Sequence, residues 1–333
     1  MRFPSTFSPN APPYKTNRSI PPPKILIPYS IFYKDIKMEK IKVLKNRGFL
    51  KALWQLTRLE HGFMLAIAVL IGALIANGGS PPLDKFIYAS LTVICIEAGA
   101  FALNDYFDLE VDIKNNRMDR PLARNDLSPK FALYLSCALI PLGVFFSVFL
   151  NKICFMIALL NALVAVLYDL KMKETKVIGN FYIAFTMAIP FLFGGAMINP
   201  DIPKIIYFIA SMAFLSGIGR EITKDLMDIE GDALRNTKSL SMYIGEKNAM
   251  RVASSLYLGA VSLSFLPFFF NFGELYFHNF RYLSIVLISD LIFFHISVRM
   301  IFFDKTEDVG THRKSSLIAA SLGLAAFLVG AFF

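Results

Sequence analysis

Two stretches of the chain share one pattern, NDYFDLEVD at residues 104–112 and KDLMDIEGD at residues 224–232. Each stretch ends a long apolar run and begins a basic loop. Three aspartates stand at i, i+3 and i+7 in each stretch, a spacing that places them on one face of a helix. They are Asp105, Asp108 and Asp112 in the first stretch, and Asp225, Asp228 and Asp232 in the second.

Carboxylates stacked in this way repel one another and need a compensating cation. Mg²⁺ suits the pattern, because this hard ion binds through a few carboxylates together with substrate phosphates. Two such faces turned toward one another would hold metal ions with a diphosphate between them. A solvated acidic face is the alternative interpretation, but the recurrence of the spacing beside apolar runs favours the metal site.

The chain is too apolar for a soluble domain of its length. It has 333 residues, of which 55% are hydrophobic and 33 are Phe, and its mean hydropathy is +0.53. A helix needs about 20 apolar residues to cross a bilayer. Nine runs reach or approach that length: 60–78, 86–104, 131–150, 153–168, 178–197, 205–221, 252–271, 282–299 and 315–333. The sequence therefore predicts an all-α membrane protein, with nine transmembrane helices arranged around a central cavity that opens to the cytoplasmic side.

The net charge of +9 is concentrated in alternate connections between the apolar runs. Four connections carry 5, 3, 6 and 4 Lys or Arg respectively: 105–130, 169–177, 220–251 and 299–314. Under the positive-inside rule these basic connections face the cytoplasm. We therefore expect an integral protein of the cell membrane, with its N-terminus and both acidic stretches on the cytoplasmic side. Its surroundings are membrane lipids, and no nucleic-acid partner is expected.

The segment before the first apolar run has two compositions. Residues 1–37 are rich in Pro and lack the apolar region and cleavage site of a signal peptide, so we expect a disordered extension. Residues 38–58 alternate apolar and basic side chains and include Trp54, a pattern typical of an interfacial amphipathic helix. Residues 59–333 then form the transmembrane domain. One hypothesis is that translation starts at Met38, and N-terminal sequencing that finds Met1 on the native protein would contradict it.

Basic side chains near the acidic stretches are candidates for binding an anion. Tyr168 and Lys171 share a helix face at i, i+3, and Arg220 and Lys224 share one at i, i+4. The other candidates are Arg58, at the turn into the first span, and two arginines after the first acidic stretch, Arg117 and Arg120. For Tyr168 and Lys171 the alternative is an interfacial aromatic residue beside a lysine that only sets the topology.

Some ionisable residues lie within or at the ends of the apolar runs. Glu97 precedes Asn104 by seven residues, two turns deeper on the same helix face. A carboxylate at membrane depth is costly and is by default a functional candidate. A protonated Glu97 bonded to a neighbouring helix fits the sequence equally well. We expect Asp290 to pair with another helix, and Glu60 and His61 to mark the membrane interface.

These motifs resemble those of the UbiA superfamily of intramembrane prenyltransferases. The first stretch matches its NDxxDxxxD motif through Asn104, Asp105, Asp108 and Asp112, and Arg120-Pro121 follows. The second matches its DxxxD motif through Asp228 and Asp232. The resemblance covers residues 55–333. Within it, GREITKDLMDIEGD at residues 219–232 is most similar to archaeal digeranylgeranylglyceryl phosphate synthases, with chlorophyll synthases similar at this stretch.

The resemblance implies Mg²⁺-dependent prenyl transfer with two metal ions. It assigns one ion to Asn104, Asp105, Asp108 and Asp112, and the other to Asp225, Asp228 and Asp232. It assigns the diphosphate to Tyr168, Lys171, Arg220 and Lys224, with Arg117 and Arg120 beside them. The residues expected to be catalytic are Asp105, Asp108, Asp228 and Lys171. The prenyl chain is expected between apolar helices, sheltered from water.

The implied donor is geranylgeranyl diphosphate, and the implied acceptor is geranylgeranylglyceryl phosphate, whose hydroxyl is prenylated in archaeal ether-lipid biosynthesis. Arg58 is then a partner for the acceptor phosphate. An aromatic acceptor (hydroxybenzoate, a naphthoate or a chlorin) is the alternative within the enzyme class. A cation transporter is the alternative outside it, although transporter sites lie near the bilayer midplane. A relative that only binds isoprenoids is disfavoured, because neither acidic motif is degraded.

Overall fold

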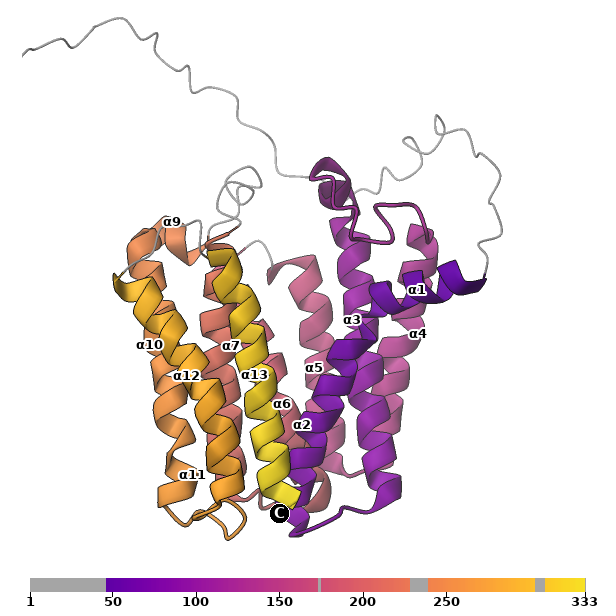
Figure 1. Cartoon of the computed structure of the whole chain (residues 1–333). Coiled ribbons are helices and arrows are strands. Elements are labelled where there is room, and N and C mark those ends of the chain that lie inside the picture. The colour runs from indigo at the N-terminus through magenta and orange to yellow at the C-terminus, as the bar shows by residue number, and fades with distance from the viewer. Residues whose placement is uncertain (1–45, 173–174, 228–238, 303–308, 333) are drawn as a thin grey trace, which may run out of the picture. The chain divides into compact units, whose positions relative to one another are not determined.

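A computed structural model describes residues 46–172, 175–227, 239–302 and 309–332 (Figure 1). These described residues form helices joined by turns, without a strand. Several features predicted from the sequence lie outside the described residues: the extension at 1–37, the first part of the interfacial helix, Asp228 and Asp232.

Within the described ranges, nine helical segments are long and apolar enough to cross a membrane. They are α2 (Leu59–Asn77), α3 (Leu83–Lys114), α4 (Pro129–Ser147), α5 (Lys152–Leu170), α6 (Lys176–Ile198), α7 (Lys204–Asp225), α10 with α11 (Glu246–Ser264 and Leu266–Phe269), α12 (Phe280–Phe302) and α13 (Val309–Phe332). The nine predicted spans are thus confirmed. The first acidic stretch is part of α3 itself, which continues without a break to Lys114.

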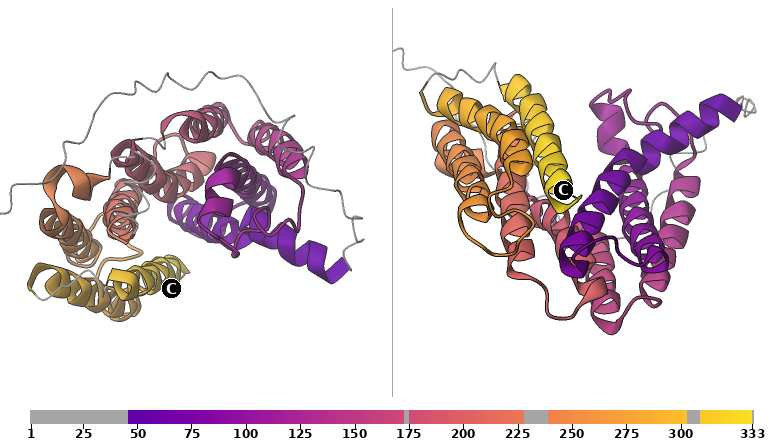
Figure 2. Two further views of the ribbon diagram at one scale, coloured as in Figure 1. Left: turned by 90° about the horizontal axis from the view of Figure 1, so that it is seen from above. Right: turned by 60° about the horizontal axis from the view of Figure 1, so that its bottom comes forward.

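Successive spans run in alternate directions, so the C-terminal ends of α3 and α7 lie at the same end of the bundle, at the top of Figure 1. α2 packs against α3 and α6, and α7 packs against α6 and α10. α13 contacts both α2 and α7, which brings the last span back beside the first (Figure 2). Both segments that carry acidic motifs therefore end at one end of the bundle.

The contact between α2 and α6 is made backbone to backbone. A Cβ atom built on Gly194 would lie 2.0 Å from the carbonyl oxygen of Val69, and one built on Gly72 would lie 2.1 Å from that of Phe191. Small residues allow such close approach of membrane helices, where van der Waals packing drives association. Gly72 and Gly194 therefore permit this close helix contact.

A short helix, α1 (Asn46–Thr57), precedes the first span and runs at an angle to it (Figure 1). Ala52 and Leu56 on one face are buried with residues of α3 and of the loop that follows it, whereas Leu50 and Trp54 are exposed. The break between α1 and α2 falls at Arg58, whose backbone is left-handed (φ 44°, ψ 52°). α1 lies within the predicted interfacial helix at 38–58, and its place at a membrane surface stays a prediction.

Candidate active site

Side chains of the first acidic stretch form hydrogen bonds with two different parts of the structure. Adjacent residues on a helix point about 100° apart, so Asn104 and Asp105 face different elements. The Asn104 amide donates a hydrogen bond to Asp169 Oδ1 of α5 (2.9 Å). Asp105 Oδ1 instead accepts hydrogen bonds from Arg58 and Arg120, both at 2.7 Å. The motif therefore joins α3 to α5 on one side and to two arginines on the other.

Arg58 is held in a defined position at the start of α2. Its guanidinium carbon lies 4.2 Å from the ring centroid of Phe101, a cation–π contact, while its Nη2 atom bonds Asp105. A left-handed backbone costs a non-glycine residue about 1–2 kcal/mol. Such strain concentrates at functional sites, where the surrounding structure maintains it. The turn directs the Arg58 side chain toward the acidic stretch, although Arg58 precedes Asp105 by 47 positions.

The loop after α3 supplies Arg120. Besides its bond to Asp105, Arg120 lies 4.0 Å from Asp112 and 3.9 Å from Asp119. Arg117 is exposed and forms a two-point ion pair with Asp119, and this hydrogen bonding lowers the pKa of the Asp119 carboxyl. Exposed pairs of this kind contribute little to stability. The side chain of Arg120 thus contacts two aspartates of the acidic motif, and the backbone N–H of Arg117 donates to the carbonyl oxygen of Asp112 (2.9 Å).

The first aspartate of the second acidic stretch is Asp225, the last residue of α7. Lys176 donates to its Oδ1 atom (3.0 Å) and the Asn180 amide donates to its Oδ2 atom (2.7 Å). Lys176 and Asn180 are one turn apart on α6, so they present one face to Asp225. Removing one member of a buried ion pair costs about 3–5 kcal/mol, because the other charge stays buried without a partner.

Glu221 holds the two predicted cations of α7. Its Oε2 atom accepts a hydrogen bond from Lys224 (2.9 Å), and its Oε1 atom lies 3.5 Å from Arg220 Nη1. Glu221 is 3% exposed, whereas the two cations keep part of their surface open. The carboxylate therefore anchors Arg220 and Lys224 from the buried side. The Arg220 Nε atom is buried without a hydrogen bond among the described residues.

Tyr168 lies near carboxylates of both α3 and α7. Its ring packs over Gly179 and against Tyr182, with ring centroids 5.1 Å apart. Its hydroxyl is within electrostatic range of Asp108 on the first stretch and of Glu221 and Asp225 on α7. The two acidic helix ends therefore converge on one region beside Tyr168. Lys171, one turn later, is exposed at the end of α5.

The oxygen donors of the site are of the kind that binds Mg²⁺, but they supply only part of the ligand shell of an ion. In the part of the chain that the structure describes, no three His, Cys, Asp or Glu side chains gather closely enough to hold a metal ion alone. Mg²⁺ commonly takes only one or two carboxylates and fills its shell with water and substrate phosphates. The carboxylates of Asp108 and Asp112 and the amide oxygen of Asn104 are hard donors of the required kind.

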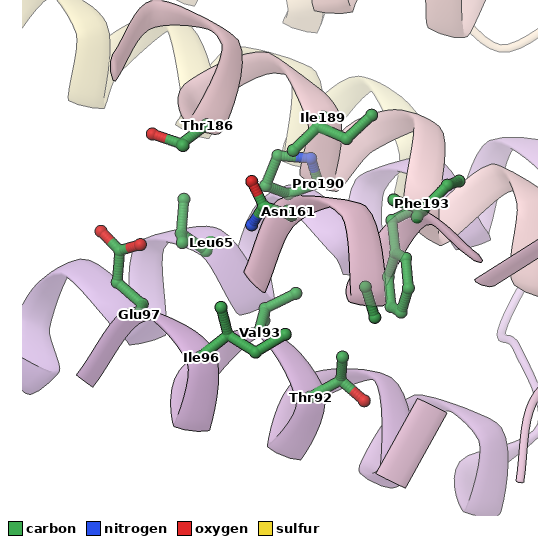
Figure 3. Close-up of a pocket in the computed structure, with 12 residues that line it drawn as sticks. Leu65, Thr92, Val93, Ile96, Glu97, Asn161, Thr186, Ile189, Pro190 and Phe193 are labelled. Carbon is green, nitrogen blue, oxygen red and sulfur yellow. The ribbon is translucent and has the colours of Figure 1, made fainter. Parts of the chain in front are cut away.

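Glu97 lines a cavity of about 30 Å³ between α2, α3, α5 and α6 (Figure 3). Asn161 and Thr186 add polar atoms to the lining, which is otherwise mostly apolar, and Asn161 Oδ1 is buried without a hydrogen bond among the described residues. This volume accommodates about two water molecules, so the large central cavity stays a prediction. Asp290 accepts a hydrogen bond from Ser264 (2.7 Å), which confirms its predicted pairing with another helix.

Four residues of the site have no role in the sequence predictions: Asp169, Lys176, Asn180 and Glu221. The positions of Lys176 and Asn180 could have been recognised from the sequence. A basic and an amide side chain at i, i+4 beside a basic loop indicate a helix face that can donate hydrogen bonds to a carboxylate. Glu221 could have been recognised too, because it lies one and three residues from Arg220 and Lys224. For Asp169 the pattern gives no such indication.

The model of the UbiA prenyltransferase family matches residues 65–310. The chain belongs to this family. A relative, the digeranylgeranylglyceryl phosphate synthase of Archaeoglobus fulgidus, is 42% identical over 295 residues, covering 89% of this chain and 100% of the relative. These matches confirm the predicted family and the predicted prenyltransferase activity. With nine apolar helices, the protein is an integral membrane prenyltransferase.

Solved structures have the same fold. A structure described as giving insights into digeranylgeranylglyceryl phosphate synthase in membranes aligns with a TM-score of 0.68 at 31% identity, covering 85% of this chain and 98% of that one. A UbiA homologue from Archaeoglobus fulgidus bound to DMAPP and Mg²⁺ aligns with a TM-score of 0.54 at 16% identity, covering 83% of this chain and 98% of that one. At this lower identity the likeness concerns the fold alone.

Proposed function

We propose that the protein transfers a geranylgeranyl group from its diphosphate to the hydroxyl of geranylgeranylglyceryl phosphate, in archaeal ether-lipid synthesis. The observation that carries the proposal is the full-length similarity to a digeranylgeranylglyceryl phosphate synthase at 42% identity. The convergence of acidic and basic side chains at one end of the bundle supports it. In this proposal that end faces the cytoplasm, in the cell membrane, as the distribution of Lys and Arg favours.

The donor diphosphate is proposed to lie between the ends of α3 and α7. Arg220 and Lys224, anchored by Glu221, offer N–H donors to its oxygens, and the Tyr168 hydroxyl lies near both acidic stretches. Cations preorganised in a dry site stabilise the negative charge that grows as the C–O bond breaks. Lys171 and Arg117, both exposed, are proposed as outer contacts for the same anion.

The reaction is a substitution at the allylic carbon. The bond between the prenyl carbon and the diphosphate oxygen breaks, the acceptor hydroxyl oxygen forms an ether bond to that carbon, and diphosphate and a proton are released. When bound, two Mg²⁺ ions supply Lewis-acid stabilisation of the departing diphosphate. Asn104, Asp108 and Asp112 are proposed to hold one ion, and Asp228 and Asp232, outside the described residues, to hold the other.

The acceptor carries its own phosphate, for which arginine is a suitable partner. Arg58 and Arg120 meet at Asp105 and each retains about a fifth of its side-chain surface exposed, 19% and 20%. An aromatic acceptor would lack this second phosphate, which makes the paired arginines an argument for the lipid acceptor. A transporter is disfavoured by the family match.

The test is turnover of radiolabelled geranylgeranyl diphosphate by the purified protein in lipid nanodiscs. The acceptor panel contains geranylgeranylglyceryl phosphate, a hydroxybenzoate, a naphthoate and a chlorin, each with Mg²⁺ or with EDTA. We expect an ether product with the lipid acceptor alone, lost in EDTA and restored by added Mg²⁺. Faster turnover of an aromatic acceptor, or EDTA-resistant transfer, would contradict the proposal.

A further inference from the structure

The first aspartate of each acidic stretch has an unusual environment. Asp105 and Asp225 occupy equivalent places in the two repeats, and they are only 1% and 3% exposed. In both cases the neighbouring elements supply the hydrogen-bond donors, and in both at least one donor is a cation. The first aspartate therefore has a similar buried, donor-paired environment in both copies of the repeat.

Asp105 joins two segments that are distant in sequence. Its Oδ1 atom accepts from Arg58 at the start of α2 and from Arg120 in the loop after α3, both at 2.7 Å. Its Oδ2 atom is buried and inaccessible to solvent, without a hydrogen bond among the described residues. Two charge-assisted bonds to one oxygen fix both guanidinium groups relative to α3.

Asp225 makes the corresponding connection at the other motif. Lys176 and Asn180 of α6 each bond one of its two oxygens, at 3.0 and 2.7 Å. Both carboxylate oxygens thus have protein partners. The lysine takes its orientation from the carboxylate, as the two arginines do at Asp105.

This environment is poorly suited to binding Mg²⁺. The ion is small, holds its ligands at about 2.0–2.1 Å and gives up its water reluctantly, so it usually keeps several waters. At Asp105 the solvent-inaccessible side chain already faces two positive groups, and at Asp225 it faces a lysine and an amide donor. A hydrated divalent cation would have to displace these partners and enter beside their charges.

We propose that Asp105 and Asp225 are positioning residues, which hold Arg58, Arg120 and Lys176 toward the phosphate groups of the substrates, and that they do not ligate Mg²⁺. The metal ligands of the first acidic stretch are then Asn104, Asp108 and Asp112. The inference rests on the proposed function, and it replaces the assignment of both aspartates to the metal ions.

The test compares Asp105→Asn and Asp225→Asn with Asp108→Asn in the full-length protein. Mn²⁺ serves as the probe, and its binding is measured by electron paramagnetic resonance in the presence of geranylgeranyl diphosphate. We expect the Mn²⁺ dissociation constant of D105N and D225N to stay within about twofold of wild type. In D108N it should rise by about tenfold or more, because a charged oxygen ligand is lost. In steady-state kinetics, D105N and D225N should raise a substrate KM by about 10- to 100-fold, because their cations are misplaced.

Two lysine variants keep the test decisive if D105N does not fold. Arg58→Lys and Arg120→Lys leave Asp105 intact but remove its paired guanidinium contacts, so they should raise KM as D105N does and leave Mn²⁺ binding unchanged. The inference is overturned if D105N or D225N weakens Mn²⁺ binding as much as D108N, if the lysine variants weaken it, or if D108N leaves it unaltered. Failure of the proposed function would look different, because wild-type protein would then bind Mn²⁺ with the prenyl diphosphate but not prenylate the glyceryl phosphate acceptor.

Discussion

Glu221 lies on the buried side of α7 with Arg220 and Lys224 bonded to its two oxygens. Replacing it with Gln keeps the size of the side chain but removes the negative charge between two cations. The two cations then repel each other without compensation and leave the geometry that suits a diphosphate. We expect Glu221→Gln to lower kcat/KM by about 10- to 100-fold, mainly through a higher KM for the prenyl diphosphate.

The matched control is Glu246→Gln, which removes the same charge from an exposed position in the first turn of α10. Steady-state kinetics with the prenyl diphosphate as varied substrate compare the two variants. Equal KM values in E221Q and E246Q would show that Glu221 does not position the cations.

At the residue scale, spacing alone identified which side chains share a helix face but not which element each face meets. The i, i+3 spacing places Asp105 and Asp108 on one helix face, and the resemblance implies that both bind one ion. That Asp105 meets Arg58 depends on the left-handed turn at Arg58 and on the tertiary contact of α1 with α3. Neither feature can be recognised from the spacing of apolar and charged residues. The partners of the buried Asp105 carboxylate could therefore be identified only from the structure.

At the scale of helices, the contact of α2 with α6 determines where the site residues lie. α2 begins next to Arg58, and α6 carries Lys176 and Asn180 near its start. A side chain at Gly194 would force these helices apart, because the atom in its way is the backbone oxygen of Val69. We expect Gly194→Ala to destabilise the protein by about 1–3 kcal/mol, as overpacking does, and to lower activity through the displaced α6.

The measurement is the apparent Tm in detergent, read from the monodisperse peak that survives heating. Gly259→Ala is the control, since a Cβ there would meet only the Leu215 side chain at 3.6 Å, an ordinary contact. A Tm for G194A equal to that of G259A would contradict a backbone contact between α2 and α6.

The spans themselves were predictable because apolar runs of this length match the thickness of a bilayer, and a helix satisfies its own backbone hydrogen bonds there. The apolar run 86–104 stops where charge begins, but the helix continues to Lys114, as the i, i+3, i+7 spacing of the aspartates predicts. Helical hydrogen bonding needs no apolar side chains, so a helix can carry the acidic stretch beyond the apolar core. This extension is what presents Asp108 and Asp112 on a continuous helix face.

At the scale of the whole molecule, the alternation of helix direction and the distribution of charge lead to one prediction about sidedness. The ends of α3 and α7 that carry the motifs lie at the same end as the start of α10, and the basic connections belong to that end (Figure 1). The opposite end carries few Lys or Arg. The positive-inside rule then assigns the motif end to the cytoplasm, where water-soluble diphosphate can leave after transfer.

Single cysteines report this directly, in a background where Cys95, Cys137 and Cys154 are replaced by Ala. Lys247→Cys lies at the start of α10, and Ser80→Cys lies in the connection between α2 and α3, at the opposite end; both positions are exposed. A membrane-impermeant maleimide should label the cysteine at 247 in inside-out vesicles but not in intact cells. It should label the cysteine at 80 in intact cells but not in inside-out vesicles. Labelling of position 247 in intact cells would place the acidic motifs outside the cell and overturn the cytoplasmic orientation, because the same end of the bundle carries both.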